Sequence, residues 1–377
     1  MLALKSVSSW FVNFNYFIVM LTFEDPYSVY EVVRVLSVSA IAFVAAMAFT
    51  PVLSHFLYKY KIGKQIRAEG DTPIFTALHA KKKGTPTMGG IMIWAVVSAL
   101  ALIFSFLASF THWEIFEALN FLNRSETFLP IGLMLLAAAV GMLDDLMGVF
   151  KIGPKGGGLS MKDRLLLYIF VAVVGAYWFY FKLGWDMIHI PAVGDFSIGI
   201  LYIPLFIFII VATSFSLNET DGLDGLAGGV ILPALAVLCA FAFLQGKVEL
   251  AMFCAAIIGT LLAFLWFNIP PARFFMGDTG SMALGVTLGT VAMLTNSFLI
   301  LPFIGFILVV ESLSVIVQLL SKKIRHKKVF LSSPIHHHFE ALGWPECKIV
   351  MRFWIISYVM CAIGLIIGLL GRGNYIF

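Results

Sequence analysis

Ten apolar segments that are candidates to cross a bilayer as helices, the eighth of them short, dominate this chain of 377 residues. A hydrocarbon core about 30 Å thick requires about 20 apolar residues in a helix. Only 12% of the residues are charged, whereas soluble domains carry about 25%. The sequence therefore predicts an all-α integral membrane protein with about ten transmembrane helices and excludes a soluble globular fold. The segments lie at 36–57, 88–109, 128–147, 164–183, 197–216, 226–246, 248–267, 280–295, 297–320 and 351–371.

The loops between these segments are short, so residues 1–377 are expected to form a single polytopic membrane domain. The stretch 10–23 is too short and too polar for a span. Residues 1–35 are therefore predicted to be an N-terminal periplasmic or interfacial segment. The four cysteines show no CxxC or paired spacing, which indicates neither a disulfide framework nor a zinc site.

The distribution of basic residues predicts the orientation of the spans. Alternate loops hold 18 of the 25 Lys and Arg residues, and loops rich in these residues face the cytoplasm. An even number of spans then places both termini on the periplasmic side. These alternate loops are 58–87, 148–164, 217–225, 268–279 and 321–350. The loop 217–225 contains no basic residue, but the alternation of spans places it on the same side as the other four.

The unusual polar clusters fall in these same loops or at the helix ends beside them. The first loop contains Lys82 in a run of three lysines, followed by turn-forming Gly84 and Pro86. Backbone N–H groups at the start of the following helix attract anions. An ordinary basic cluster flanking the membrane is the alternative interpretation.

Two adjacent carboxylates, Asp144 and Asp145, end the third apolar segment. Such groups are costly at a membrane unless they are solvated or paired. Neighbouring residues on a helix point about 100° apart, so we expect these two side chains to have different roles. A pair that merely reaches the interface remains the alternative.

Three acids and no basic residue occupy the loop 218–225, on the side where basic residues are expected. Asp221 and Asp224 are three residues apart and would share one helix face. The spacing differs from a calcium-binding EF-hand loop. We interpret this loop, with Asn218, as a binding site rather than as a set of helix caps.

In the stretch 266–281, Asp278 lies where the eighth segment begins. This carboxylate is predicted to be either a metal ligand or the cap of that helix. Phe274 or Phe275 could stack on a flat base. In the last loop, consecutive histidines point in different directions, so they suit phosphate contacts better than one metal ion. These histidines are His336, His337 and His338.

Carboxylates beside basic residues are what a magnesium-assisted phosphoryl transfer requires, because Mg²⁺ is held by one or two carboxylates and the substrate phosphates. A site at the membrane surface would let a lipid acceptor meet a donor from the cytosol. Nothing in the sequence indicates a nucleic-acid partner.

Five motifs of this chain resemble, in order, those of the phospho-N-acetylmuramoyl-pentapeptide transferase family, within the polyprenyl-phosphate N-acetylhexosamine-1-phosphate transferase superfamily. The resemblance implies a Mg²⁺-dependent transfer from UDP-MurNAc-pentapeptide to undecaprenyl phosphate, giving lipid I and UMP. It also implies ten spans, a place in the bacterial inner membrane and a possible homodimer. The motifs are GTPTMGG (84–90), GMLDD (141–145), NETDGLDGLAGG (218–229), FLWFNIPPARFFMGDTGSMALG (264–285) and PIHHHFEALGWPE (334–346).

The resemblance also implies roles for individual residues. Asp278 matches a magnesium ligand, and Asp144 and Asp145 match a catalytic pair. Lys82 matches a lysine of the nucleotide site, and His336 and His337 match histidines near the phosphates. The positions that match a nucleoside-sugar pocket are Asn218, Asp221, Asp224, Asn268 and Phe275, the last of which would stack on uracil.

One departure from the family pattern concerns the cations of the site. Members usually carry Lys three residues after the second Asp, where this chain has Gly148. Lys151, from the next turn, is a possible substitute.

Three other functions fit the sequence less well. A transferase of the same superfamily using UDP-GlcNAc is disfavoured by the PIHHHFE segment. An ion-coupled transporter would need charged residues near the middle of the bilayer, whereas the acids are expected at helix ends on one side. A non-enzymatic scaffold is disfavoured by the acids of the loop 218–225.

Overall fold

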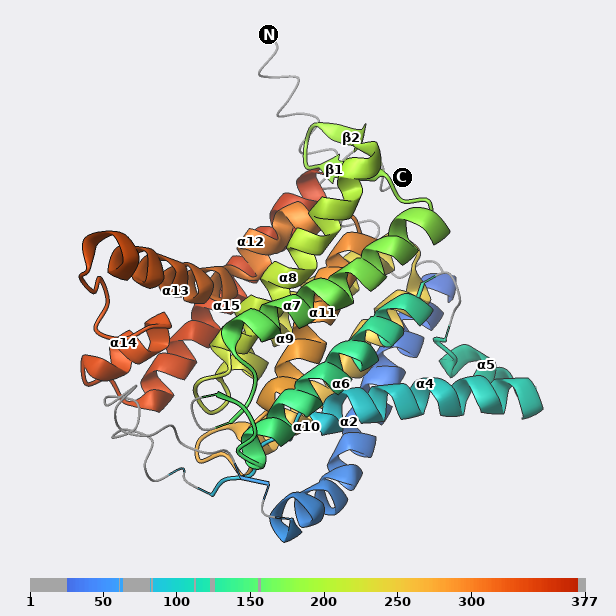
Figure 1. The fold of residues 1–377 in the computed structure, drawn as a ribbon. Coiled ribbons are helices and arrows are strands. Elements are labelled where there is room, and N and C mark those ends of the chain that lie inside the picture. The colour runs from blue at the N-terminus through green and yellow to red at the C-terminus, as the bar shows by residue number, and fades with distance from the viewer. Residues whose placement is uncertain are drawn as a thin grey trace.

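A computed structural model describes residues 26–60, 62–63, 82, 84–111, 113–122, 126–154 and 157–371. The stretch 10–23 lies outside these residues. Helices account for most of the described chain, which confirms the all-α membrane class (Figure 1). The α-helices are α2 (Pro26–Lys59), α4 (Ile91–Thr111), α5 (Glu114–Leu119), α6 (Phe128–Val149), α7 (Met161–Tyr177), α8 (Tyr202–Thr220), α9 (Leu226–Leu244), α10 (Val248–Asn268), α11 (Gly277–Leu294), α12 (Leu301–Ile304), α13 (Phe306–Arg325), α14 (Ile335–Ala341) and α15 (Glu346–Gly371).

Within the described residues, eight helices are long and apolar enough to cross a membrane, or nine if one bent pair counts as a single span. The first of them begins at Pro26, ten residues before the expected start at 36. Proline suits the first turn of a helix, because its missing N–H would have no partner there.

The expected eighth span, 280–295, corresponds to α11, which is not among the eight. Its sequence is rich in Gly and Thr, and every residue except Asp278 is buried. Close packing by other helices replaces lipid around it, so a strongly apolar sequence is not needed. α9 and α10 are also mostly buried, and with α11 they form the interior of the bundle.

The expected ninth span, 297–320, is not one straight helix. It breaks at Gly305 into a short segment containing α12 and the longer α13, which differ in direction by 84°. Figure 1 shows α13 projecting sideways from the bundle. One face of α13 buries Glu311 and Gln318, whereas Leu313 and Leu320 are exposed on the other. This two-sided pattern fits a helix that packs along one face rather than one surrounded by lipid.

A small β-hairpin, which the sequence analysis did not foresee, connects the segment after α7 to α8. β1 (Met187–Ile190) pairs antiparallel with β2 (Gly194–Ser197), with Met187 opposite Ser197. α7 continues into a π-helical turn (Trp178–Lys182), and short 3-10 turns precede α8 (Gly199–Leu201) and α12 (Phe298–Ile300). In Figure 1 the hairpin lies at one end of the bundle and α14 lies toward the other.

Candidate active site

The carboxylates of the predicted site meet where α6 crosses α11. Gly141 lies against the backbone of Asp278, and a Cβ at this position would overlap the Asp278 carbonyl. Glycine therefore allows the two helices to approach closely. This approach brings Asp144, one turn further along α6, beside the first turn of α11.

Arg164, in the first turn of α7, connects three polar side chains. Its Nη2 lies 2.7 Å from Asp144 Oδ2 and 3.3 Å from Asp278 Oδ2. Its Nη1 donates to Asn218 Oδ1 at 3.0 Å. The side chain of Asp144 is only 1% exposed, so this guanidinium offsets a carboxylate that water hardly reaches. We call Asp144, Arg164, Asn218 and Asp278 the carboxylate–arginine cluster.

Further hydrogen bonds fix the orientation of this cluster. Asn218 Nδ2 donates to Asp278 Oδ1 at 2.6 Å and to Ser281 Oγ at 3.0 Å. The Leu159 backbone N–H donates to Asp144 Oδ1 at 2.6 Å. The two carboxylates therefore lie in a fixed arrangement around one cation.

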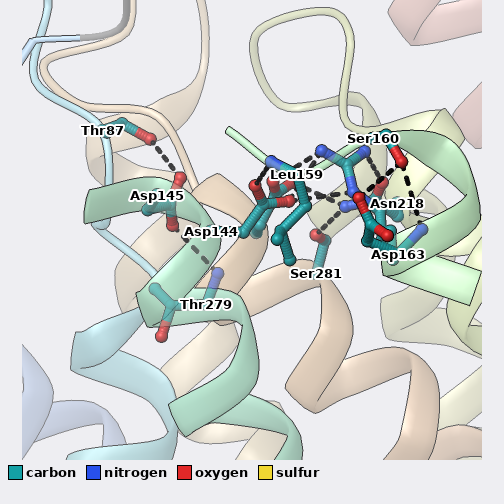
Figure 2. Close-up of polar contacts among 11 residues, drawn as sticks. Thr87, Asp144, Asp145, Leu159, Ser160, Asp163, Asn218, Thr279 and Ser281 are labelled. Carbon is teal, nitrogen blue, oxygen red and sulfur yellow. Dashed lines mark hydrogen bonds and ion pairs between the residues drawn. The ribbon is translucent and has the colours of Figure 1, made fainter. Parts of the chain in front are cut away.

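Asp145 has different partners from Asp144, as the helix geometry predicted. Asp145 accepts from the backbone N–H of Thr279 at 3.0 Å and from Thr87 Oγ1 at 3.3 Å. Figure 2 shows Asp145 turned toward Thr87 and Thr279, while Asp144 lies on the side of Leu159 and Asn218. Asp145 thus connects the start of α11 to the loop before α4.

A second cluster surrounds Lys82. Its ammonium lies 2.6 Å from Asp224 Oδ1 and 2.5 Å from Glu346 Oε1, at the start of α15. Glu346 Oε1 also accepts from the Asp224 backbone N–H at 2.7 Å, and Asp224 Oδ2 accepts from the Ala272 N–H at 3.1 Å. Residues from four distant parts of the chain are thereby joined, and we call Lys82, Asp224 and Glu346 the lysine cluster.

The structure distinguishes the two neighbouring phenylalanines. Phe274 is fully buried and packs against Phe264 and Phe267. Phe275 is partly exposed, with its ring centroid 6.0 Å from Lys82 Nζ. Only the Phe275 ring is therefore open to a ligand beside the lysine cluster.

Asn268 holds two loops of this region together, but its side chain is not exposed to a ligand. It is buried, accepts from the Gly225 N–H at 2.9 Å and donates to the Phe274 carbonyl at 2.9 Å. Asp221 ends α8, where its backbone N–H bonds the carbonyls of Leu217 and Asn218.

The three histidines contact different neighbours, as predicted. His336 is fully buried, and its Nδ1 lies 3.0 Å from Glu311 Oε2 on α13. His337 Nδ1 lies 2.6 Å from Glu340 Oε2, and His338 Nδ1 accepts from the Leu331 N–H at 3.2 Å. All three lie in α14, but these contacts give each of them a different partner.

His336 lies in a charged and enclosed environment. Burial alone would lower the pKa of His336, but the neighbouring Glu311 carboxylate outweighs this and raises it above the usual value. Its Nε2 edge faces Gly222, which has no room for a side chain. His336 therefore holds α14 against both α13 and the loop 218–225.

Lys151 does not replace the lysine that members of the resembled family usually carry at the position of Gly148. Its side chain is exposed, whereas Arg164 makes the contacts with Asp144 and Asp278. Arg164 was not identified as a site residue from the sequence. It could have been found as a basic residue at the start of the apolar segment 164–183, on the same side of the membrane as the acidic loop 218–225. Glu311 and Glu346 were also not identified.

No group of three or more His, Cys, Asp or Glu side chains within the described residues has the geometry of a metal site. Two carboxylates, Asp144 and Asp278, nevertheless approach the same guanidinium nitrogen. A pair of this kind suits Mg²⁺, which takes one or two carboxylates and completes its shell with substrate phosphates and water.

Comparisons with known proteins show the family to which this chain is related. Residues 127–296 match the family described as Glycosyl transferase family 4. A phospho-N-acetylmuramoyl-pentapeptide-transferase of Thermoanaerobacter sp. (strain X514) is 39% identical over 326 residues, which cover 86% of this chain and 96% of the relative. The same-named protein of Geobacillus sp. (strain WCH70) is 37% identical over 339 residues, covering 89% of this chain and 98% of the relative.

A third relative of that name, from Clostridium perfringens (strain 13 / Type A), is 39% identical over 331 residues, covering 88% of this chain and 97% of the relative. Identity at this level extends over nearly the full length of each relative. The chain belongs to the phospho-N-acetylmuramoyl-pentapeptide transferase family.

Proposed function

We propose that this chain transfers phospho-MurNAc-pentapeptide from UDP-MurNAc-pentapeptide to undecaprenyl phosphate, giving lipid I and UMP. Family membership supports the reaction. The structural observation that supports it best is the convergence of Asp144 and Asp278 on Arg164, with Asp278 only three residues after Phe275, whose ring lies near Lys82. Carboxylates and a guanidinium for the phosphates, with an open aromatic ring nearby in the same loop, suit a nucleoside diphosphate.

The lysine cluster and Phe275 form the proposed nucleotide pocket. Phe275 would stack on uracil, and Lys82 would release one carboxylate to contact a phosphate oxygen. Asp224 is placed to accept from the base or ribose. Asn268 acts from behind by holding Gly225 and Phe274 in position, and Asp221 fixes the end of α8 that leads into the pocket.

Asp278 is the proposed magnesium ligand, with Asp144 as its neighbour. Mg²⁺ bound there would offset charge on the pyrophosphate during transfer. Arg164 holds the two carboxylates together and can contact phosphate oxygens with the N–H groups of its planar fork. Asn218 keeps the Asp278 carboxylate oriented through its hydrogen bond.

Asp144 is the more suitable base of the adjacent pair. Both carboxylates accept hydrogen bonds, but Asp144 faces Arg164 and Asp278, where the phosphates would bind, whereas Asp145 faces Thr87 and Thr279. Asp144 would take the proton of the acceptor phosphate as an oxygen of that phosphate attacks the sugar-linked phosphorus. The bond between this phosphorus and the oxygen that bridges it to the α-phosphate then breaks, and UMP leaves with that oxygen.

The histidines divide into two proposed roles. His336 is a positioning residue, because it is fully buried between Glu311 and Gly222. His337 and His338 are partly exposed and would donate to phosphate oxygens.

The proposed topology places this end of the bundle in the cytoplasm and both termini in the periplasm, in a bacterial inner membrane. The many basic residues of the loops at the site end support this orientation. A homodimer and the membrane lipids are the expected partners.

The test is UMP release by the detergent-purified full-length protein, given UDP-MurNAc-pentapeptide and undecaprenyl phosphate, with and without Mg²⁺. We expect release to require the donor, the lipid acceptor and the metal together. Release with UDP-GlcNAc but not with the MurNAc donor would instead assign the chain to another donor within the superfamily. A folded, monodisperse preparation that is inactive with both donors would contradict the proposal.

Phe275→Ala is expected to raise the KM for the UDP donor by about tenfold, since stacking of a base on an aromatic ring contributes about 1–3 kcal/mol. The turnover number at saturating donor should change much less, because the ring does not contact the transferred group. Steady-state kinetics in both substrates measures the two effects. Phe275→Trp serves as the matched control and should retain donor affinity, whereas an unchanged KM in Phe275→Ala would exclude stacking.

A further inference from the structure

A pocket of about 260 Å³ lies between the end of α2 and the loop that follows α10, outside both clusters of the active site. It is closed on one side by helix α2 and on the other by the last turn of α10. The residues that line it are Thr50, Pro51, Ser54, His55, Tyr58, Phe267 and Arg273. No acidic side chain is among them, and nothing in the proposed reaction uses them.

Arg273 is held in a defined place at this pocket. Its backbone N–H donates to the Phe267 carbonyl at 2.8 Å, and its carbonyl accepts from the Tyr58 hydroxyl at 2.8 Å. Its guanidinium carbon lies 5.5 Å from the centroid of the Phe267 ring. The side chain is exposed at the pocket, and a guanidinium matches the geometry of phosphate oxygens.

The other polar groups show which donors a ligand could use. The hydroxyls of Thr50 and Ser54 donate to carbonyls of their own helix, and the Tyr58 hydroxyl donates to the Arg273 carbonyl. His55 is exposed, and its ring packs edge-on against the Phe56 ring. The donors that face the pocket are therefore basic, which selects an anion.

The surroundings of the pocket fit the boundary between lipid headgroups and acyl chains. Val52 and Phe56 are exposed on α2, and Trp266 and Ile269 are exposed at the end of α10. Aromatic side chains such as Trp266 and Tyr58 are enriched at this depth of a membrane. An occupant of the pocket would thus have apolar protein surface beside it for its hydrocarbon chains.

We propose that this pocket binds the phosphate headgroup of an anionic membrane phospholipid. The reacting phosphate of the acceptor lipid must lie at the carboxylate–arginine cluster, and none of the residues of that cluster lines the pocket. The pocket is therefore a second phosphate site. Arg273 lies five residues before Asp278, so an occupying lipid would also steady the loop that carries Phe275.

The test measures lipid binding directly, without donor, so its outcome does not depend on the proposed reaction. Full-length protein in detergent is titrated with phosphatidylglycerol, and retained lipid is counted by native mass spectrometry. We expect Arg273→Gln to weaken the tightest binding step by about tenfold, because it removes a charge-assisted hydrogen bond to the headgroup phosphate. His55→Gln should weaken it less, and Arg273→Lys should fall between Arg273→Gln and the unchanged protein.

Arg325→Gln is the matched control, because Arg325 is an exposed arginine at the end of α13, and it should bind as the unchanged protein does. Equal losses in Arg325→Gln and Arg273→Gln, or no loss in Arg273→Gln, would overturn the site. Phosphatidylcholine should not compete, and inorganic phosphate should compete weakly. If undecaprenyl phosphate displaces the lipid from the unchanged protein but not from Arg273→Gln, the pocket belongs to the acceptor and the phospholipid assignment is wrong.

Discussion

Asp278→Ala is expected to abolish transfer, with turnover reduced at least about a thousandfold, which corresponds to about 4 kcal/mol of transition-state stabilisation. Asp278 accepts from Asn218 at 2.6 Å and lies beside Arg164, so its charge is fixed where the pyrophosphate would bind. Removing the carboxylate removes the proposed magnesium ligand and leaves Arg164 with one acid partner fewer. UMP release over a range of Mg²⁺ concentrations measures the effect.

Two further variants separate the charge of Asp278 from its packing. Asp278→Asn retains the size of the side chain but not its charge, so it should be almost as inactive as Asp278→Ala. Asp163→Ala removes an exposed carboxylate in the first turn of α7, whose hydrogen-bond partner is Ser160. This control should retain activity within about threefold, since losing a capping contact costs about 1 kcal/mol at most sites. Near-normal turnover in folded, membrane-inserted Asp278→Ala would disprove the metal assignment.

The gathering of the site at one end of the bundle was predictable from the sequence. Lys82, Asp224, Asn268 and Phe275 come from three loops that the basic residues had assigned to one side of the membrane. The structure joins these loops through the Lys82–Asp224 ion pair and the Asn268–Gly225 hydrogen bond, with the partly exposed Phe275 ring beside Lys82. The choice between Phe274 and Phe275 was not predictable, because adjacent residues differ only in which one the fold buries.

The broken helix could not be predicted from hydropathy, which sums apolar residues without regard to direction. The segment 297–320 is mostly apolar, yet α13 turns by 84° after Gly305 and buries polar residues on one face. Glu311 lies within this segment, so the expectation that acids occupy only helix ends was wrong for this residue. Its pairing with His336 explains the position without an ion pathway.

The β-hairpin was missed for a different reason. Its strands have four residues each, and β2 contains Gly194, Asp195 and Ser197, which are uncommon in strands. Contacts with the ends of neighbouring helices supply what the local sequence lacks. The Ala192 N–H, for example, donates to the Gly371 carbonyl, and Asn296 accepts from the His189 N–H.

Arg164→Ala is expected to reduce turnover by at least about a hundredfold and to destabilise the protein. Arg164 contacts Asp144, Asn218 and Asp278 through three nitrogens. Without it, two neighbouring carboxylates would repel each other, and Asp144 is almost fully buried. Removing one partner of a buried ion pair typically costs about 3–5 kcal/mol. UMP release and thermal unfolding, both with and without Mg²⁺, measure the two effects.

Two substitutions decide whether Arg164 supplies the cation that Gly148 does not. Arg164→Lys retains the charge but loses the planar fork, so it should restore stability more fully than turnover. Lys151→Ala should change turnover by less than about twofold, because Lys151 is exposed and makes none of the contacts that Arg164 makes. Loss of more than tenfold in Lys151→Ala, together with normal turnover in Arg164→Ala, would reverse the assignment. The site would then need a rearrangement that brings Lys151 to Asp144. The hydrogen bond from the Leu159 N–H to Asp144 argues against such a rearrangement, because it already occupies one oxygen of that carboxylate.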